Sequence, residues 1–191
     1  SKLFEKFGKT ANIINMNFLS WKPNIQFDFV IGNPPFNCNG IKKVPTNKEK
    51  KKKEDGQTIW IAFVKKSIDL LREGGKLCII IPSIWMKPDK QNMYSYMLQY
   101  NIQKLHCLTN TETNKVFQGL AQTPTCYFLL EKTPTQNQLS LYDKKQQQDI
   151  PYNVRENYPI PVFGARIINK LLPFTDQYGS IKYYKSNSPS N

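Results

Sequence analysis

The chain has 191 residues, enough for one domain with a substantial core or for most of a domain and part of another. A hydrophobic content of 39% argues against general disorder. Lys and Arg number 27 against 14 Asp and Glu, and the resulting charge of +13 indicates a polyanionic partner, nucleic acid first, unless the lysines serve only solubility.

The first elements are predicted strands. Residues 11–19 (ANIINMNFL) predict a strand with little before it, although a parallel strand needs neighbours. Residues 27–32 (FDFVIG) predict a buried parallel strand, and Asn33, Pro34, Pro35 and Phe36 follow it directly. Ligands of open α/β sheets bind beyond the carboxyl ends of such strands, so this tetrapeptide is the first candidate site.

The middle of the chain alternates helix and strand signals. Residues 37–55 hold seven lysines and predict a long, mobile loop, either merely solvated or in contact with phosphates. Residues 58–72 have helical apolar spacing, and Gly74 and Gly75 follow as a C-cap signal. We expect a strand at 76–82 and a helix at 89–100.

Two further strands are expected at residues 102–109 and 125–131, joined by a loop that contains Phe117. With no helix between them, they are expected to be antiparallel neighbours at one edge of a doubly wound α/β sheet. Residues 133–149 read as a linker or surface excursion. In residues 150–191 only a short helix near 165–172 is assigned.

Cysteine and histidine usage gives no catalytic or metal-binding signal. Cys38, Cys78, Cys107 and Cys126 are scattered, and three of them lie in or beside apolar runs, as core cysteines do. A disulfide framework and a zinc site are both poorly supported, so no metal is expected. His106 lies on an apolar strand without a partner and is interpreted as structural. The chain shows no signal peptide and no membrane-length apolar run, which favours a cytoplasmic protein that is not secreted.

The tetrapeptide suits the methylation of an exocyclic amine. The lone pair of such an amine is delocalised into its ring, and acceptors for both N–H groups turn that lone pair toward an electrophile. Asn33 offers a side-chain carbonyl and Pro34 a backbone carbonyl, while the prolines restrict the backbone before substrate arrives. Phe36 offers a stacking face for a base, which must be flipped out of a duplex.

Residues 12–36 resemble the N6-adenine DNA methyltransferases that use S-adenosylmethionine, especially those of restriction–modification systems. The family motif (D/N/S)-P-P-(Y/F) falls on Asn33, Pro34, Pro35 and Phe36, which the resemblance makes the catalytic residues. The family's A-D-F-L segment falls on residues 16–19 (MNFL). The resemblance implies cofactor binding by Asn17, Phe18 and Asn33, with Asn17 in place of the family's acidic residue.

The resemblance extends to residues 12–132. Residues 59–82 resemble the family's helix, Gly-Gly turn and fifth strand, and residues 123–132 its final strand. Phe117 falls where the family places an aromatic against the second face of the flipped base, so Phe36 and Phe117 are the expected stacking pair. The implied fold is a Rossmann-like S-adenosylmethionine-dependent methyltransferase sheet, mixed and mostly parallel.

One family feature is missing. No glycine-rich turn and no acidic ribose-binding strand end occur before residue 11, so the N-terminal strands are expected to be missing. Residues 1–132 then form the C-terminal part of a catalytic domain, and residues 150–191 begin a DNA-recognition region. A missing N-terminal half or a partner subunit is then expected to supply the glycine-rich cofactor loop.

The expected function is methyl transfer to adenine N6 in DNA. Two alternatives stay open at this point. Protein-glutamine and RNA methyltransferases share the Asn-Pro-Pro-aromatic motif, because a side-chain amide presents similar N–H geometry. A catalytically silent nucleic-acid-binding module would explain the missing cofactor half.

Overall fold

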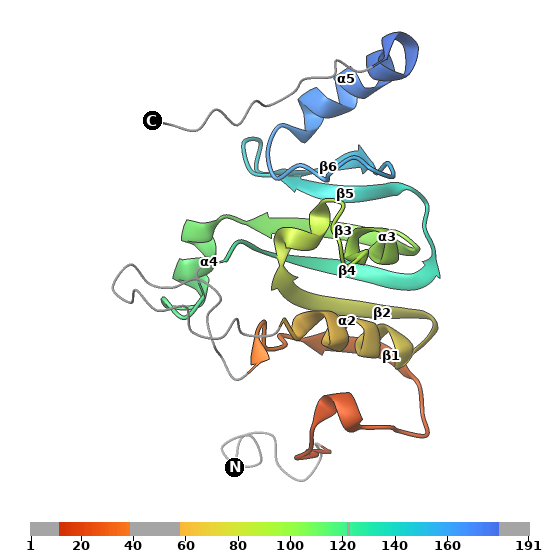
Figure 1. Ribbon diagram of the computed structural model, residues 1–191, viewed down its shortest axis with the longest axis vertical. Coiled ribbons are helices and arrows are strands. Elements are labelled where there is room, and N and C mark those ends of the chain that lie inside the picture. The colour runs from red at the N-terminus through yellow and green to blue at the C-terminus, as the bar shows by residue number, and fades with distance from the viewer. Residues whose placement is uncertain (1–11, 39–57, 122, 180–191) are drawn as a thin grey trace.

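Six strands form one sheet in the part of the chain that the computed structural model describes, residues 12–38, 58–121 and 123–179. Most of the predicted lysine-rich loop lies outside these ranges. The order across the sheet is β1-β2-β4-β3-β5-β6, and the strands follow one another along the long axis of the molecule (Figure 1). Their bounds are β1 Phe27–Gly32, β2 Leu71–Pro82, β3 Tyr100–Leu108, β4 Thr125–Pro134, β5 Gln138–Asp143 and β6 Gln148–Asn153.

The sheet is mixed, as expected. Strands β1 and β2 are parallel, as are β3 and β5, whereas the pairs β2–β4, β3–β4 and β5–β6 are antiparallel. Antiparallel pairs therefore outnumber parallel pairs among the described strands. The expectation of a mostly parallel sheet is wrong for this part of the chain. Strands β3 and β4 are antiparallel neighbours, as predicted, but they lie inside the sheet because β5 and β6 extend it.

Two helices cover one face of the sheet. Helix α2 (Trp60–Asp69) confirms the helix predicted from apolar spacing, and α3 (Met93–Met97) is shorter than predicted. Both lie on the same face in Figure 1. The helix expected near 165–172 is α5 (Ala165–Tyr178), and the short 3-10 turns are η2 (Phe18–Ser20) and η4 (Ser83–Met86). No helix in the described ranges is long and apolar enough to span a membrane.

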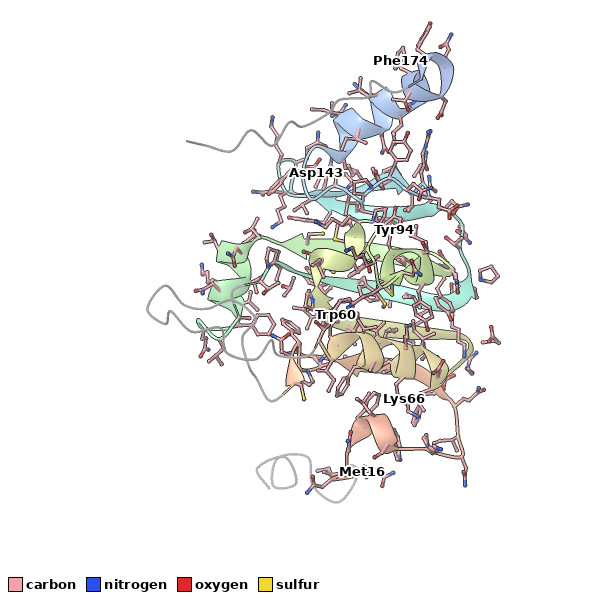
Figure 2. The ribbon with its side chains drawn as sticks, viewed as in Figure 1. Met16, Trp60, Lys66, Tyr94, Asp143 and Phe174 are labelled. Atoms are coloured by element: carbon pink, nitrogen blue, oxygen red, sulfur yellow. The ribbon has the colours of Figure 1, made fainter. Side chains whose placement is uncertain are left out.

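The core lies between the sheet and this pair of helices. Along β2, Leu77, Ile79 and Ile81 are buried, as alternate residues of a half-covered strand should be. Trp60 of α2 and Tyr94 of α3, labelled in Figure 2, are buried in this core. The Tyr94 hydroxyl donates to the backbone carbonyl of Arg155 at 2.9 Å, so the segment after β6 is fastened to the core.

Three further sequence expectations, about individual segments, are wrong. Residues 12–17 form no strand, and Ile14 and Met16 are exposed, because no described strand offers them a ladder of hydrogen bonds. The linker expected at 133–149 instead contains β5, whose Leu139 and Leu141 are buried. The connection between β3 and β4 contains helix α4 (Asn110–Val116) rather than a loop alone.

The cysteines divide between the core and the surface. Cys107 and Cys126 are buried and face each other across β3 and β4. Burial raises the pKa of the Cys107 thiol to about 12, so both behave as apolar core groups. Cys78 is exposed, contrary to the expectation of burial, because it points from β2 away from α2.

His106 lies in an aromatic stack on the sheet face opposite α2. Its ring stacks on Tyr142 of β5 at 4.1 Å between centroids and on Tyr127 of β4 at 4.8 Å. Burial, and secondly the charge of Lys144, lower the pKa of His106. These contacts are those of a packing residue, in keeping with the structural interpretation.

Acidification is expected to weaken the fold through His106. The imidazole is neutral in the folded state but becomes protonated in the unfolded chain below its ordinary pKa of 6.5. The unfolded chain thus binds more protons, and the free energy of unfolding falls as the pH drops below about 6.5. Urea unfolding at pH 7.5 and 5.5 measures this fall. His106→Phe keeps a stacking ring without a proton site, and an equal fall in that variant contradicts the assignment.

Candidate active site

The Asn-Pro-Pro-Phe segment leaves the sheet at the carboxyl end of β1, where the sequence placed it. Asn33 is exposed, Pro34 is buried and Phe36 is half-buried. The exposed Asn33 side chain is a hydrogen-bond acceptor open to solvent. The backbone beside it is restricted by the packing and by the ring of Pro34. The segment can therefore present the Asn33 side-chain oxygen and a neighbouring backbone carbonyl to a ligand.

The start of α2 fastens the end of this segment. The Ile59 amide donates to the Phe36 carbonyl at 3.2 Å, and Asn37 forms an isolated antiparallel bridge with Thr58. Phe36 packs against the hydrophobic core. These contacts fix the backbone of Phe36 next to the N-terminus of α2, and nothing in the sequence motif indicated them.

Phe117 lies next to Phe36, although 80 residues separate them in the sequence. The ring centroids are 6.1 Å apart with an interplanar angle of 74°, an edge-to-face contact. Helix α4 delivers Phe117, which is its C-cap residue. The structure thus brings together the two aromatic residues that the sequence assigned to one base.

Phe18 packs against α2, the helix whose start also contacts the tetrapeptide, and Asn17 directly precedes Phe18. The Asn17 side-chain oxygen accepts a hydrogen bond from the Leu19 amide at 3.0 Å and caps η2. Phe18 stacks on Phe63 of α2 at 5.4 Å between centroids. Phe63 is one helical turn from Ile59, so the two candidate groups contact α2 about 6 Å apart along its axis.

These residues retain capacity for a cofactor. A carbonyl oxygen has two lone pairs, and the Leu19 amide uses one of those on Asn17. Asn17 is exposed and Phe18 half-buried. An adenine ring could therefore meet the open edge of Asn17 and the part of Phe18 that Phe63 leaves uncovered.

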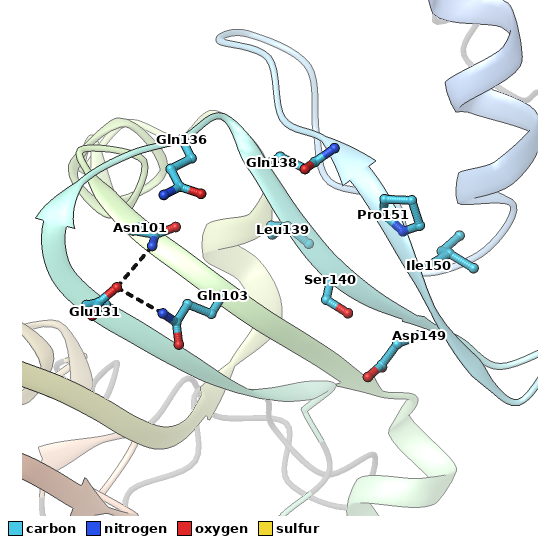
Figure 3. A pocket seen from close by; sticks show the side chains of 10 residues that line it. All are labelled: Asn101, Gln103, Glu131, Gln136, Gln138, Leu139, Ser140, Asp149, Ile150 and Pro151. Carbon is cyan, nitrogen blue, oxygen red and sulfur yellow. Dashed lines mark hydrogen bonds between the residues drawn. The ribbon is translucent and has the colours of Figure 1, made fainter.

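A polar cavity among the described residues lies away from the tetrapeptide. It has a volume of about 460 Å³ and polar walls that include Gln103, Ser140 and Asp149 (Figure 3). Its walls come from β3, β4, β5 and β6, whereas the tetrapeptide follows β1, which lies on the far side of β2. This cavity is therefore separate from the tetrapeptide.

A smaller hollow lies at the start of α2. Its volume is about 260 Å³, and its walls include Trp60, Trp85 and Lys90. Thr58, which bridges to Asn37, also lines it. No group of three or more His, Cys, Asp or Glu side chains suited to a metal ion occurs within the described part of the chain.

Sequence reasoning missed the supports of Phe117. Helix α4 begins with a capping box, in which the Thr109 side chain accepts from the Glu112 amide and Glu112 accepts from the Thr109 amide. The Thr-x-x-Glu spacing was readable in the sequence. The hydrogen-bonded pair Thr113 and Thr125, at 2.9 Å between hydroxyl oxygens, was not, because it joins a helix to a strand.

The Asn-Pro-Pro-Phe segment follows a parallel strand of a mixed α/β sheet, an arrangement consistent with the expected Rossmann-like methyltransferase fold. The model of the Eco57I restriction-modification methylase family matches residues 2–117, which include the tetrapeptide and Phe117. The chain belongs to this family.

The similar proteins include methyltransferases and modification methylases. A type II methyltransferase of Thermus thermophilus is 33% identical over 84 residues, covering 38% of this chain and 20% of its own length. Modification methylase CviBIII of Paramecium bursaria Chlorella virus NC1A is 26% identical over 158 residues, covering 75% of this chain and 36% of its own. The chain thus spans only a minor part of these relatives.

A solved structure supports the fold. A chain from work on the assembly and conformational transition of the type I R-M system aligns with a TM-score of 0.50 at 16% identity. The alignment covers 88% of this chain and 34% of that one. At such identity the likeness concerns the fold alone.

Proposed function

We propose that this chain carries the target-base half of a site-specific DNA methyltransferase, which transfers a methyl group from S-adenosylmethionine to adenine N6 within a restriction–modification system. The observation that carries the proposal is the exposed Asn33 beside the Phe36–Phe117 pair at the end of β1. Membership of the restriction-modification methylase family and the charge of +13 support it.

In this proposal Asn33 and Pro34 act on the amine. The Asn33 side-chain oxygen and the Pro34 carbonyl accept the two N6–H bonds, so the nitrogen lone pair turns out of the ring plane. S-adenosylmethionine, when bound, supplies an electrophilic methyl group. The amine nitrogen would form the new N–C bond as the bond from the methyl carbon to the sulfonium sulfur breaks, leaving a neutral thioether, and would then release one proton to solvent. The restricted backbone of Pro34 and Pro35 holds the acceptors in place, which is how a preorganised site lowers a barrier.

Phe36 and Phe117 hold the base, but Phe117 must first move. A base between two rings needs two van der Waals contacts of about 3.5–4 Å, hence about 7–8 Å between the ring planes. The rings here contact each other edge-on with centroids 6.1 Å apart. We infer that Phe117 fills part of the base site without DNA and swings aside when the adenine enters.

Asn17 and Phe18, with Asn33, are the proposed cofactor contacts on this chain. Asn17 would accept from the cofactor's adenine amino group and Phe18 would pack beside that ring. The glycine-rich loop for the methionine end is proposed to come from an N-terminal half or a partner subunit. Residues 150–191, with α5, are proposed to begin the DNA-recognition region, and the protein is proposed to act in the cytoplasm or wherever its DNA lies.

The test is methyl transfer by the full-length gene product. Labelled S-adenosylmethionine is supplied with duplex DNA, RNA or protein, and the modified DNA is digested to nucleosides. Label in N6-methyladenine from DNA supports the proposal. Label only in RNA or in a glutamine side chain favours the alternatives, and salt-dependent DNA binding without any transfer favours a silent module.

A further inference from the structure

Lys144 is a largely buried lysine in a chain with an excess of surface cations. It directly follows β5, and its side chain is only 12% exposed. Its ammonium group forms an ion pair with Glu112 of α4 and lies 6.0 Å from the centroid of the Phe163 ring. One side chain thereby joins the β5–β6 turn, the helix that carries Phe117 and the segment before α5.

Glu112 receives this contact at the start of α4. Its carboxylate also accepts from the Thr109 amide at 2.7 Å and from the Thr109 hydroxyl at 2.8 Å. The hydrogen bond from Lys144, followed by that from the Thr109 amide, lowers the pKa of Glu112 to about 2. The first turn of α4 is therefore held to the β5–β6 turn by a carboxylate that stays ionised.

The other end of α4 holds Phe117. The Phe117 amide donates to the Thr113 carbonyl at 2.9 Å, and the Gly119 amide donates to the Asn114 carbonyl at 2.8 Å. The Thr113 hydroxyl fastens the helix to Thr125 of β4. A helix of seven residues is about 10 Å long and moves as one body, so a shift of its first turn reaches Phe117.

We propose that Lys144 is a positioning residue, whose ion pair with Glu112 couples the β5–β6 hairpin and the segment before α5 to Phe117. In this way the downstream part of the chain sets where Phe117 stands when the target base enters. The inference rests on the base contact proposed for Phe117.

The Lys144–Glu112 ion pair contributes more to the position of α4 than to the stability of the fold. Burying a charged side chain costs free energy that its ion pair only partly returns. Without Lys144, the Glu112 carboxylate keeps its Thr109 hydrogen bonds and stays 45% exposed to water. Removal of the lysine therefore leaves no buried unpaired charge, and the fold is expected to survive.

The test uses Lys144→Met in the full-length protein, with Lys145→Met as the matched control. Lys145 is the next residue and is exposed. The substrate is duplex DNA with 2-aminopurine at the target position, whose fluorescence rises when the base leaves the stack. We expect Lys144→Met to lower both this rise and kcat on the order of tenfold, with KM for DNA changed less than threefold. Lys144→Arg, which keeps the charge, is expected to restore most of both.

The outcomes separate the inference from the proposed function. Lys144→Met behaving like Lys145→Met overturns the coupling, as does a Lys144→Arg variant no better than Lys144→Met. The fraction of unfolded Lys144→Met is measured by circular dichroism at the assay temperature. If this fraction accounts for the whole loss of activity and fluorescence, Lys144 only stabilises the fold, and the coupling is overturned as well. Phe117→Ala is measured alongside. If Phe117→Ala keeps the full fluorescence rise, the proposed base contact itself is wrong. If Phe117→Ala loses the rise but Lys144→Met keeps it, only the coupling is rejected.

Discussion

Replacement of Asn33 by alanine is expected to lower kcat for methyl transfer by about 10²–10³-fold, with little change in the free energy of unfolding. Asn33 is exposed at the end of β1, so its truncation leaves no cavity and no buried unpaired group. Removal of one preorganised hydrogen-bonding group from a reacting centre typically costs this much. The expected loss is in the chemical step, because the base still stacks on Phe36.

Single-turnover methylation of duplex DNA by the full-length protein measures this effect, with DNA binding measured separately. Asn33→Asp is the matched control, because a carboxylate keeps the acceptor and the family motif admits Asp at this position. Activity close to wild type in Asn33→Asp and its loss in Asn33→Ala are expected together. Unchanged activity in Asn33→Ala rejects the catalytic role of the tetrapeptide.

Elements with strong local signals could be predicted from the sequence. Helix α2 follows from apolar residues at helical spacing, and Trp60, Val64 and Ile68 are indeed buried. Strands β2 and β4 follow from continuous apolar runs, as does the position of the tetrapeptide after β1. These features depend on neighbouring residues, so no knowledge of the partner elements is needed.

Elements that depend on distant partners could not be predicted in the same way. Residues 11–19 have the apolar content of a strand, yet residues 12–17 form none, since a strand exists only with a partner for its backbone groups. Strand β5 was hidden by its polar surroundings, although Leu139 and Leu141 alternate as a half-buried strand requires. Its parallel pairing with β3 spans more than thirty residues of sequence.

The same distinction between local and distant contacts applies to the candidate site. The motif located Asn33 and Phe36, and the family resemblance located Phe117 without showing what holds it. The supports of Phe117 come from α4, from Thr125 of β4 and from the β5–β6 turn. They are single contacts between elements, and each can be formed by many residue types. A site motif is therefore readable in the sequence, whereas the contacts that hold it need the structure.

Gly75→Ala is expected to reduce the free energy of unfolding by about 3 kcal/mol, because no space exists for its methyl group. A Cβ at Gly75 would lie 2.9 Å from the backbone oxygens of Arg72 and Phe27, and backbone atoms cannot rotate away as side chains do. The tight approach arises where the β1–β2 pairing shifts. Phe27 pairs with Leu71 and Phe29 with Lys76, so β2 bulges over residues 72–75. The sequence indicated a helix cap at Gly74 and Gly75, whereas they form this bulge.

Gly74→Ala is the matched control, since it adds the same methyl group one residue earlier. Its Cβ would meet only the Arg72 side chain at 3.7 Å, and the cost comes from its positive φ of 73°, about 1 kcal/mol. Urea unfolding of both variants measures the difference. Equal destabilisation by Gly74→Ala and Gly75→Ala would mean that backbone conformation alone accounts for the need for glycine at both positions. A larger loss at Gly75 assigns it to the close approach of β1, the strand from which Asn33 is presented.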